Sequence, residues 1–250
     1  MITTFQHKNK KYTVDLNQPL DISIPVKATE ESVNAWYILP PEIKPVRDQD
    51  WVAKVSEGAA VNFNNIHFNP HSHGTHTESL GHITPTFYDI NQTLTTYHFI
   101  AQLITISPVK DQEDFIITEE ILTQHIKEIP DALIIRTLPN PIQKKSKNHS
   151  HTNWPYLTQA AARWICKQNI KHLLIDLPSV DKEKDDGKLE AHKAFWGFPD
   201  QLRKQATITE LIYVEDTIPD GIYLLNLQVA PIQNDAAPSR PLLYKILDTL

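Results

Sequence analysis

Short runs in which apolar and polar residues alternate mark the first strands of a predicted sheet. Residues 12–16 and 22–25 both alternate, and polar residues with a proline separate them. Alternation with a period of two is typical of a strand that buries one face. Residues 59–68 have the same character and lead directly into a stretch rich in histidine. We therefore expect this third strand to deliver the histidines to the end of a sheet.

Longer apolar runs predict buried strands, and one segment predicts an amphipathic helix. The strands are expected at residues 99–106, 131–137, 172–177, 206–214 and 222–227, with weaker candidates at 115–117 and 242–244. Residues 156–168 place apolar side chains at i, i+3, i+4, i+7 and i+8, the spacing of one helix face. Shorter helices are expected at 118–127 and 190–196. Helices that are followed by apolar strands predict an α/β fold.

No stretch divides the chain into separate units. Residues 26–57 contain prolines at 40, 41 and 45 and predict a long irregular loop, and residues 138–153 predict a second loop. Long loops in compact domains are often functional lids. Because the chain has neither a dividing linker nor an internal repeat, we expect a single domain over residues 1–250.

The composition excludes several classes of function. A formal net charge of −6 over 250 residues gives no electrostatic reason to bind nucleic acid or an anionic membrane. The six glycines form no GxGxxG, P-loop or GxSxG motif, which argues against common nucleotide cofactors and serine hydrolases. Cys166 is the single cysteine, and no apolar run resembles a signal peptide or a membrane span. We expect a cytoplasmic protein that acts on a small molecule.

Histidine is concentrated in residues 67–82. Five of the twelve histidines and two of the six glycines fall within this segment. Imidazole nitrogens suit zinc and other first-row divalent ions, and carboxylates complete such sites. His71, His76 and Glu78 therefore form the first predicted ligand set of a metal site.

A second ion is compatible with the same segment, because a carboxylate can bridge two ions about 3.5–4 Å apart. Glu78 is the candidate bridge, and His192 and Glu210, each at the edge of a predicted element, are candidate ligands of the second ion. His82 follows His76 by six residues and is not needed to complete the ligand set. Histidine transfers protons well near neutrality, so we expect His82 to be a general acid and base.

The run over residues 74–82 resembles the signature HxGTHxDxPxH of the cyclase family of metal-dependent hydrolases, which includes the bacterial kynurenine formamidases. The resemblance covers roughly residues 59–245, through residues 154–157, residues 175–181, the strand with Glu210, and residues 238–240. It implies a swivelling β/β/α-type α/β domain with a mixed sheet. It also implies a homodimer or larger homo-oligomer that binds one or two ions of zinc, or sometimes manganese, per chain.

Three positions depart from the family pattern. Ser72 stands where the family has its first histidine ligand, and either His71, through a one-residue insertion, or His73 can take that role. His71 is the preferred candidate. Glu78 replaces the family's aspartate, and Leu80 replaces its proline. The extra methylene of a glutamate must move either the ion or the backbone, so the family's metal and substrate preferences need not apply.

The resemblance implies hydrolysis of an amide, with an aryl formamide such as N-formylkynurenine as the first candidate substrate. His82 would move a proton from water to the departing nitrogen, and His192 and Glu210 match the family's late ligands. The alternatives are a hydrolase of a cyclic amide or another small carbonyl compound, and a metal-binding member of the family that has lost catalysis. An aromatic substrate pocket would draw on three tryptophans, Trp36, Trp51 and Trp154.

Overall fold

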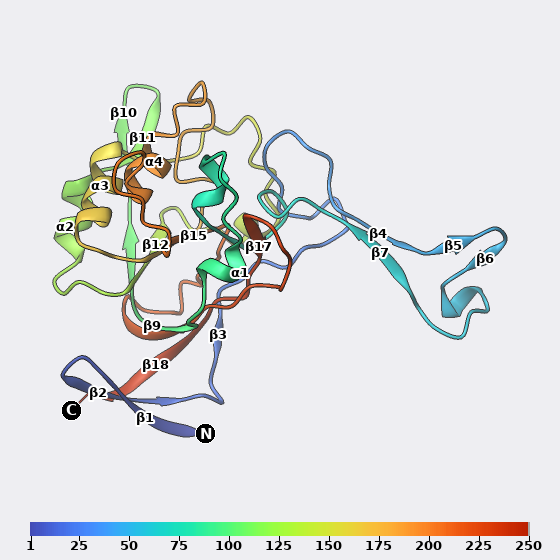
Figure 1. Ribbon diagram of the computed structural model, residues 1–250, viewed down its shortest axis with the longest axis horizontal. Helices are drawn as coiled ribbons and strands as arrows, with labels where there is room; N and C mark the ends of the chain where they lie inside the picture. The colour runs from blue at the N-terminus through green and yellow to red at the C-terminus, as the bar shows by residue number, and fades with distance from the viewer. Residues whose placement is uncertain (250) are drawn as a thin grey trace.

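One large mixed sheet forms the centre of the computed structural model, which describes residues 1–249 (Figure 1). In spatial order its strands are β1 (Ile2–His7), β2 (Lys10–Asp15), β18 (Leu242–Thr249), β16 (Gly221–Asn226), β9 (His98–Ile106), β12 (Ala132–Thr137), β14 (His172–Ile175), β15 (Thr207–Glu210), β8 (His76–Glu78) and β17 (Ala236–Pro238), with β3 (Leu20–Asp21) paired to β18. Strands β9, β12, β14 and β15 are parallel, and the pairings on either side of them are antiparallel. This arrangement confirms the predicted α/β fold with a mixed sheet.

Helices cover one face of the parallel strands. α2 (Glu119–His125), α3 (Gln159–Lys167) and α4 (Glu190–Trp196) lie together on this face (Figure 1). Every side chain of β12 and β14 is buried, as expected for parallel strands that are covered on both sides. Ile165 of α3 and Phe195 of α4 join Leu173 in the core on this face. The opposite face packs against α1 (Ile90–Thr93) and against Ile22.

The amphipathic helix begins later than its apolar pattern predicts. β13 (Tyr156–Leu157) pairs with β11 (Asp114–Ile117), which in turn pairs with β10 (Val109–Asp111). The side-chain oxygen of Thr158 then accepts a hydrogen bond from the backbone amide of Ala161. This cap satisfies a free amide of the first helical turn and fixes the start of α3 at Gln159.

The strand expected at residues 59–68 does not join the main sheet. Instead β7 (Asn64–His67) pairs with β4 (Glu42–Pro45), and β5 (Arg47–Asp48) pairs with β6 (Trp51–Val52). With η1 (Val55–Glu57), these strands form an arm, residues 42–67, that projects from the body of the protein (Figure 1). Part of the predicted irregular loop is therefore a hairpin.

The polar residues gather at one edge of the main sheet. β8 lies between β15 and β17 and is antiparallel to both. Glu210 is the last residue of β15, at the carboxyl end of the parallel strands, where α/β proteins commonly bind ligands. η2 (Leu80–Ile83) follows β8, and η3 (Ile142–Ser146) follows β12. Among the residues described, no helix is both long and apolar enough to cross a bilayer.

Candidate metal centre

β8 places His76 and Glu78 on the same face of the sheet, because residues two apart along a strand point to the same side. Glu210 is the partner of His76 on β15 and belongs to this face. Gly74 makes the entry into β8 possible. Its φ is +112°, and a Cβ atom at this position would lie 2.8 Å from the backbone oxygen of Ile24. A side chain is therefore excluded at the point where the chain turns into the strand.

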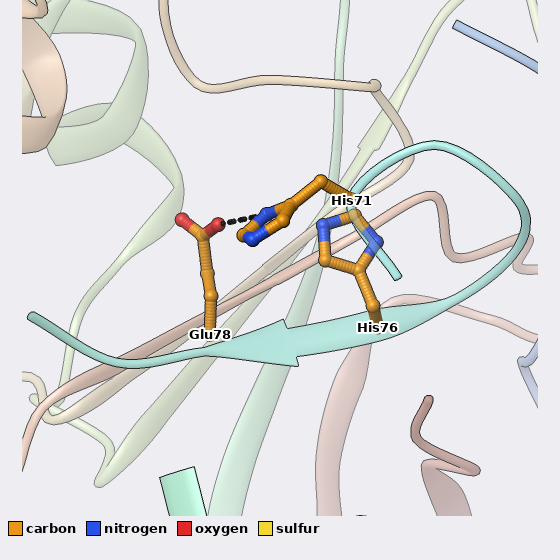
Figure 2. A group of neighbouring side chains, drawn as sticks. All are labelled: His71, His76 and Glu78. Carbon is orange, nitrogen blue, oxygen red and sulfur yellow. Dashed lines mark ion pairs between the residues drawn. The ribbon is translucent and has the colours of Figure 1, made fainter. Parts of the chain in front are cut away.

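His71, from the loop before β8, points toward Glu78 (Figure 2). Its Nδ1 lies 3.1 Å from Oε2 of Glu78, and its ring lies edge-on to that of His76. Nδ1 of His76 lies 3.1 Å from the backbone oxygen of Gly74, so Nε2 is the nitrogen that faces the other side chains. One donor atom from each of His71, His76 and Glu78 lies within 4.8 Å of the others. The structure thus brings the first predicted ligand set together.

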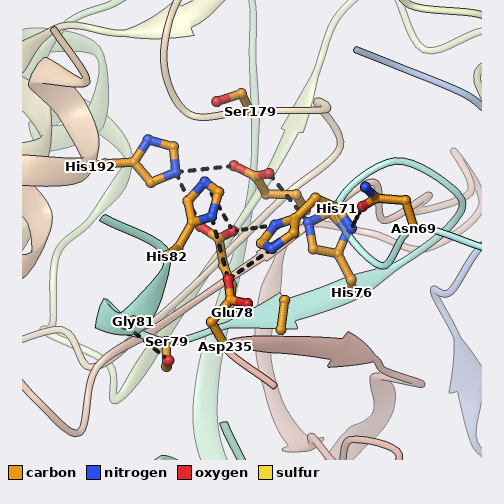
Figure 3. A network of polar contacts seen from close by, with 12 residues as sticks. Asn69, His71, His76, Glu78, Ser79, Gly81, His82, Ser179, His192 and Asp235 are labelled. Atoms are coloured by element: carbon orange, nitrogen blue, oxygen red, sulfur yellow. Dashed lines mark hydrogen bonds and ion pairs between the residues drawn. The ribbon is translucent and has the colours of Figure 1, made fainter. Parts of the chain in front are cut away.

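His192, which Figure 3 shows beside His82, and Glu210 reach the same cluster from distant parts of the chain. Nε2 of His192 lies 3.1 Å from Oε1 of Glu78 and 3.8 Å from Oε1 of Glu210. Oε2 of Glu210 lies 3.5 Å from Nε2 of His76. The carboxylate of Asp181 is hydrogen-bonded to Nδ1 of His192 and accepts from the backbone amide of the same residue. Glu78 therefore lies between the two groups of candidate ligands, where a bridging carboxylate has to be.

His82 lies at the open side of the cluster. Its side chain is 32% exposed, whereas that of Glu78 is fully buried. Nε2 of His82 lies 3.9 Å from Oε2 of Glu78, and Nδ1 lies 3.5 Å from Oδ2 of Asp235. The same Oδ2 is hydrogen-bonded to Nε2 of His71 at 2.9 Å. No local pattern in the sequence marks Asp235, because its place depends on the pairing of the strand after it with β8.

Ser72, which stands at the family's ligand position, and His73, the alternative first ligand, point away from the cluster. The hydroxyl of Ser72 donates to the backbone oxygen of Ala35 at 2.6 Å. His73 accepts at Nδ1 from the backbone amide of Asn69 at 2.9 Å. Of the two histidines that flank Ser72, the structure therefore brings His71 to the cluster and turns His73 toward the preceding loop.

Two of the three tryptophans lie together. Trp36 packs edge-on against Trp154 with ring centroids 5.1 Å apart, and Trp154 is part of the core. Trp51 lies on β6 in the arm and is 47% exposed. Within residues 1–249, Trp51 thus lies in the projecting arm, apart from the pair that Trp36 and Trp154 form.

Paired charges inside the cluster shift its pKa values. Burial disfavours the charged form of His71, but the hydrogen bond to Asp235 and the nearby charge of Glu78 outweigh that effect and raise the pKa of His71 to about 10. The same competition raises the pKa of His192 well above its usual value through its two carboxylate partners. Burial favours protonation of Glu78, yet the charge of His82, the hydrogen bond from His192 and the proximity of His71 hold its pKa well below the usual range. The buried carboxylate thus stays ionised because the surrounding histidines supply positive charge, which a bound cation would supply in their place.

Two buried atoms of the cluster that could bind a metal ion have no hydrogen-bond partner. They are Nε2 of His76 and Oε2 of Glu78. The second of these lies close to Nδ1 of His71, but the two groups are not aligned as in a hydrogen bond. An unsatisfied polar group in the interior costs about 1–3 kcal/mol, so a ligand is needed to explain two of them in one place. Imidazole and carboxylate donors are those of zinc sites, and these residues fit a divalent metal ion.

The mixed sheet and the buried histidine and glutamate cluster at its edge define a metal-dependent hydrolase-like fold. The profile of the Cyclase family matches residues 14–182, which is more than half of the chain. The protein therefore belongs to the Cyclase family, as the sequence resemblance predicted. The matched range ends before His192, Glu210 and Asp235, so their place in the cluster comes from the structure.

Solved structures share this fold at low sequence identity. A protein from Bacillus stearothermophilus, described as a predicted metal-dependent hydrolase, has a TM-score of 0.64 at 17% identity, over 91% of this chain and 98% of that protein. Isatin hydrolase A from Labrenzia aggregata has a TM-score of 0.65 at 16% identity, over 92% of this chain and 94% of its own. Isatin hydrolase A from Ralstonia solanacearum has a TM-score of 0.57 at 16% identity, over 91% of both chains. These likenesses establish the fold alone. A comparison with curated proteins finds no match.

Proposed function

We propose that the protein is a metal-dependent hydrolase of amide bonds and that its substrate is an aryl formamide such as N-formylkynurenine. The proposal rests on the two buried, unpaired donor atoms of His76 and Glu78, with the ring of His82 beside them at the open side. Metal-assisted amide hydrolysis uses a Lewis acid at the carbonyl oxygen and a group that moves a proton. A metal site next to a partly exposed histidine offers both.

Five residues would hold the metal. His71, His76 and Glu78 would bind one ion, and Glu78, His192 and Glu210 would bind a second. Zinc suits this set of nitrogen and oxygen donors, with manganese as the alternative. A bound ion of this kind polarises a carbonyl oxygen and lowers the pKa of water to about 7. The two oxygens of Glu78 face His71 and His192 respectively, which is why the bridging role falls to this residue.

His82 would move the proton that the reaction transfers. A departing amide nitrogen must be protonated as the carbon–nitrogen bond breaks, and the attacking water must lose a proton. One histidine can do both in turn, by taking the proton from water and giving it to the nitrogen. Nε2 of His82 faces the cluster and the partly exposed ring borders the solvent, so substrate and ring can meet there.

Trp36 supports an aromatic substrate. The backbone oxygen of the preceding residue, Ala35, accepts the hydroxyl hydrogen of Ser72, which is next to His71 in the chain. The pair of Trp36 and Trp154 is thereby tied to the loop that carries the first proposed ligand. An aryl group held against such a pair gains apolar burial and edge-to-face contacts.

A cyclic amide is the second candidate substrate. The structures that share the fold include isatin hydrolases, whose names describe action on isatin. Opening a cyclic amide needs the same two functions, a Lewis acid and a proton carrier, since the ring nitrogen is the leaving group. The two candidate substrates therefore require pockets of different shape, but the same metal centre could act on both.

The test combines elemental analysis of the purified protein with hydrolysis assays on N-formylkynurenine, a simple aryl formamide and isatin. We expect one or two zinc ions per chain and the fastest turnover on a formamide. Faster turnover of isatin would favour the cyclic amide instead. Bound metal without activity on any of the three would indicate a metal-binding protein that has lost catalysis. A protein that binds no divalent ion after reconstitution would refute the proposal.

A further inference from the structure

We propose that Asp235 is a positioning residue whose single carboxylate orients both His71 and His82; the inference rests on the function proposed above. Oδ2 of Asp235 lies 2.9 Å from Nε2 of His71 and 3.5 Å from Nδ1 of His82 (Figure 3). The two imidazole rings stack, with centroids 4.3 Å apart and 27° between their planes. Asp235 thus meets one nitrogen of each ring along the same side of the stack.

The second nitrogen of each ring faces the proposed metal centre. Nδ1 of His71 lies 3.1 Å from Oε2 of Glu78, and Nε2 of His82 lies 3.9 Å from the same oxygen. A neutral imidazole has its proton on one nitrogen and a lone pair on the other, and a carboxylate selects the nitrogen that keeps the proton. Asp235 therefore leaves the lone pair of His71 free to bind a metal ion and that of His82 free to accept a proton.

The backbone holds Asp235 firmly in this place. Its carbonyl oxygen accepts from the amide of Ser79 at 2.9 Å, and the oxygen of the preceding Asn234 accepts from the amide of Ile90 at 2.9 Å. The next residues form β17, which pairs with β8. Gly81 lies against the same residue: a Cβ atom there would meet the backbone oxygen of Tyr88 at 2.7 Å and Cβ of Asp235 at 3.2 Å. These backbone contacts fix the position of the Asp235 carboxylate relative to β8.

The displaced first ligand explains why this chain needs such support. The residue at the family's position, Ser72, turns its side chain toward Ala35, and His71 reaches the cluster from one position earlier in the loop. A ligand that arrives from a loop has no neighbouring strand to fix its ring. Asp235 supplies the missing constraint, in the way that Asp181 does for His192 on the other side of the cluster.

Zinc titration of Asp235→Asn and Asp235→Ala tests the first half of the proposal. We expect the same number of zinc ions per chain as in the wild type, with a dissociation constant about 10–100-fold higher. Asp131→Asn is the matched control, because Asp131 is similarly buried and faces His7 at 3.2 Å at the opposite end of the parallel strands. Its zinc affinity should equal that of the wild type. An unchanged affinity in both Asp235 variants would overturn the proposal, and the loss of one ion would make Asp235 a ligand instead.

A double-mutant cycle with His82→Asn tests the second half, on whichever of the three amides the wild type hydrolyses fastest. If Asp235 acts through His82, Asp235→Asn should lower kcat in the wild type and have a much smaller effect when His82 is already replaced. If the two substitutions lower kcat independently, so that their effects on the activation free energy add, Asp235 has a structural role and this part of the proposal is overturned. The tautomer of His82 in the zinc-loaded protein, read from ¹⁵N–¹H spectra, decides the same point without a substrate. Protonation at Nε2 in the wild type would contradict the proposal. A wild type that binds no zinc would refute the proposed function itself.

Discussion

The candidate metal centre and the arm reverse the usual distribution of side chains in opposite ways. In the centre, polar groups are buried, and His76 and Glu78 are fully enclosed. In the arm, large apolar groups are exposed, and Phe63 and Ile66 are each 60% exposed. Burying a charge is unfavourable unless it is paired, and exposed apolar surface forgoes about 25 cal/mol per Å². Neither region is explained by the stability of one folded chain.

The two regions differ in how much they reveal about their partners. The donor atoms of the first ligand set in the centre lie within 4.8 Å of one another, and convergent imidazoles and carboxylates are the ligands found in divalent-cation sites. The apolar side chains of the arm are spread along a narrow hairpin, which is only marginally stable in water without further packing. Another protein surface would be needed to cover them. The family resemblance makes a second copy of this chain the expected one.

The largest effect is expected from His76→Ala, which removes one of the two unpaired buried donors. The variant should lose its metal and its hydrolytic activity. Zinc that binds only the folded state stabilises the wild type by about 2.7 kcal/mol at a hundredfold excess over its dissociation constant, and this gain should vanish. Elemental analysis and thermal unfolding with and without zinc measure both results. Metal content equal to that of the wild type would remove His76 from the ligand set.

His82→Asn should separate the proton carrier from the ligands. We expect the metal content and the thermal stability to stay as in the wild type, while turnover falls by about 10²–10⁴-fold, the usual contribution of general acid–base catalysis. Steady-state kinetics on a formamide, with metal analysis of the same sample, measures the effect. Loss of metal would make His82 a ligand, and full activity would exclude it from the mechanism.

Glu210→Gln has a smaller expected effect, because Glu210 would bind only one of the two ions that Glu78 bridges. If Glu78 spans two ions, the variant should bind one ion per chain where the wild type binds two. A calorimetric titration with zinc counts the ions that each protein binds. Saturation of the wild type at one ion would contradict the bridging role and leave Glu210 as a structural residue that accepts from the amide of Val180.

Substitutions in the arm should have the smallest effect on the single chain. Trp51→Ser combined with Phe63→Ser changes exposed positions, so the free energy of unfolding of the monomer should change by no more than about 0.5 kcal/mol per site. Metal content should be unchanged. Sedimentation equilibrium should show a homo-oligomer for the wild type and a smaller species for the variant. A monomeric wild type would contradict the expected homo-oligomer.

The first ligand set was predictable because its residues are close together in the sequence. His71, His76 and Glu78 lie within one short segment, and the cluster of histidines in that segment is visible without a structure. His192 and Glu210 were found through their match to the late ligands of the family. Asp235 has no such signal, because its role depends on the pairing of β17 with β8, which brings together residues distant in the chain.

The arm shows what an alternating sequence pattern does not determine. Alternation over residues 59–68 predicts a strand with one buried face, and a strand is present at Asn64–His67. Its partner is β4 in an exposed hairpin, and no residue of β7 is buried. Alternation of apolar and polar residues indicates an extended backbone with one apolar and one polar face. It does not report what covers the apolar face, because that depends on where the strand lies in the assembled protein.

The place of β8 between β15 and β17 has a consequence for the order in which the protein is made. His76 leaves the ribosome long before its strand partner Glu210, and the second neighbour of β8 follows only at residues 236–238. Until then the nascent segment has no sheet to join, and contacts so distant in sequence form slowly. A chain that stops before residue 207 lacks both neighbours of β8, although it already contains β9, β12 and β14. A partial chain therefore lacks the strand pairings that bring Glu210 and Asp235 beside His76 and Glu78.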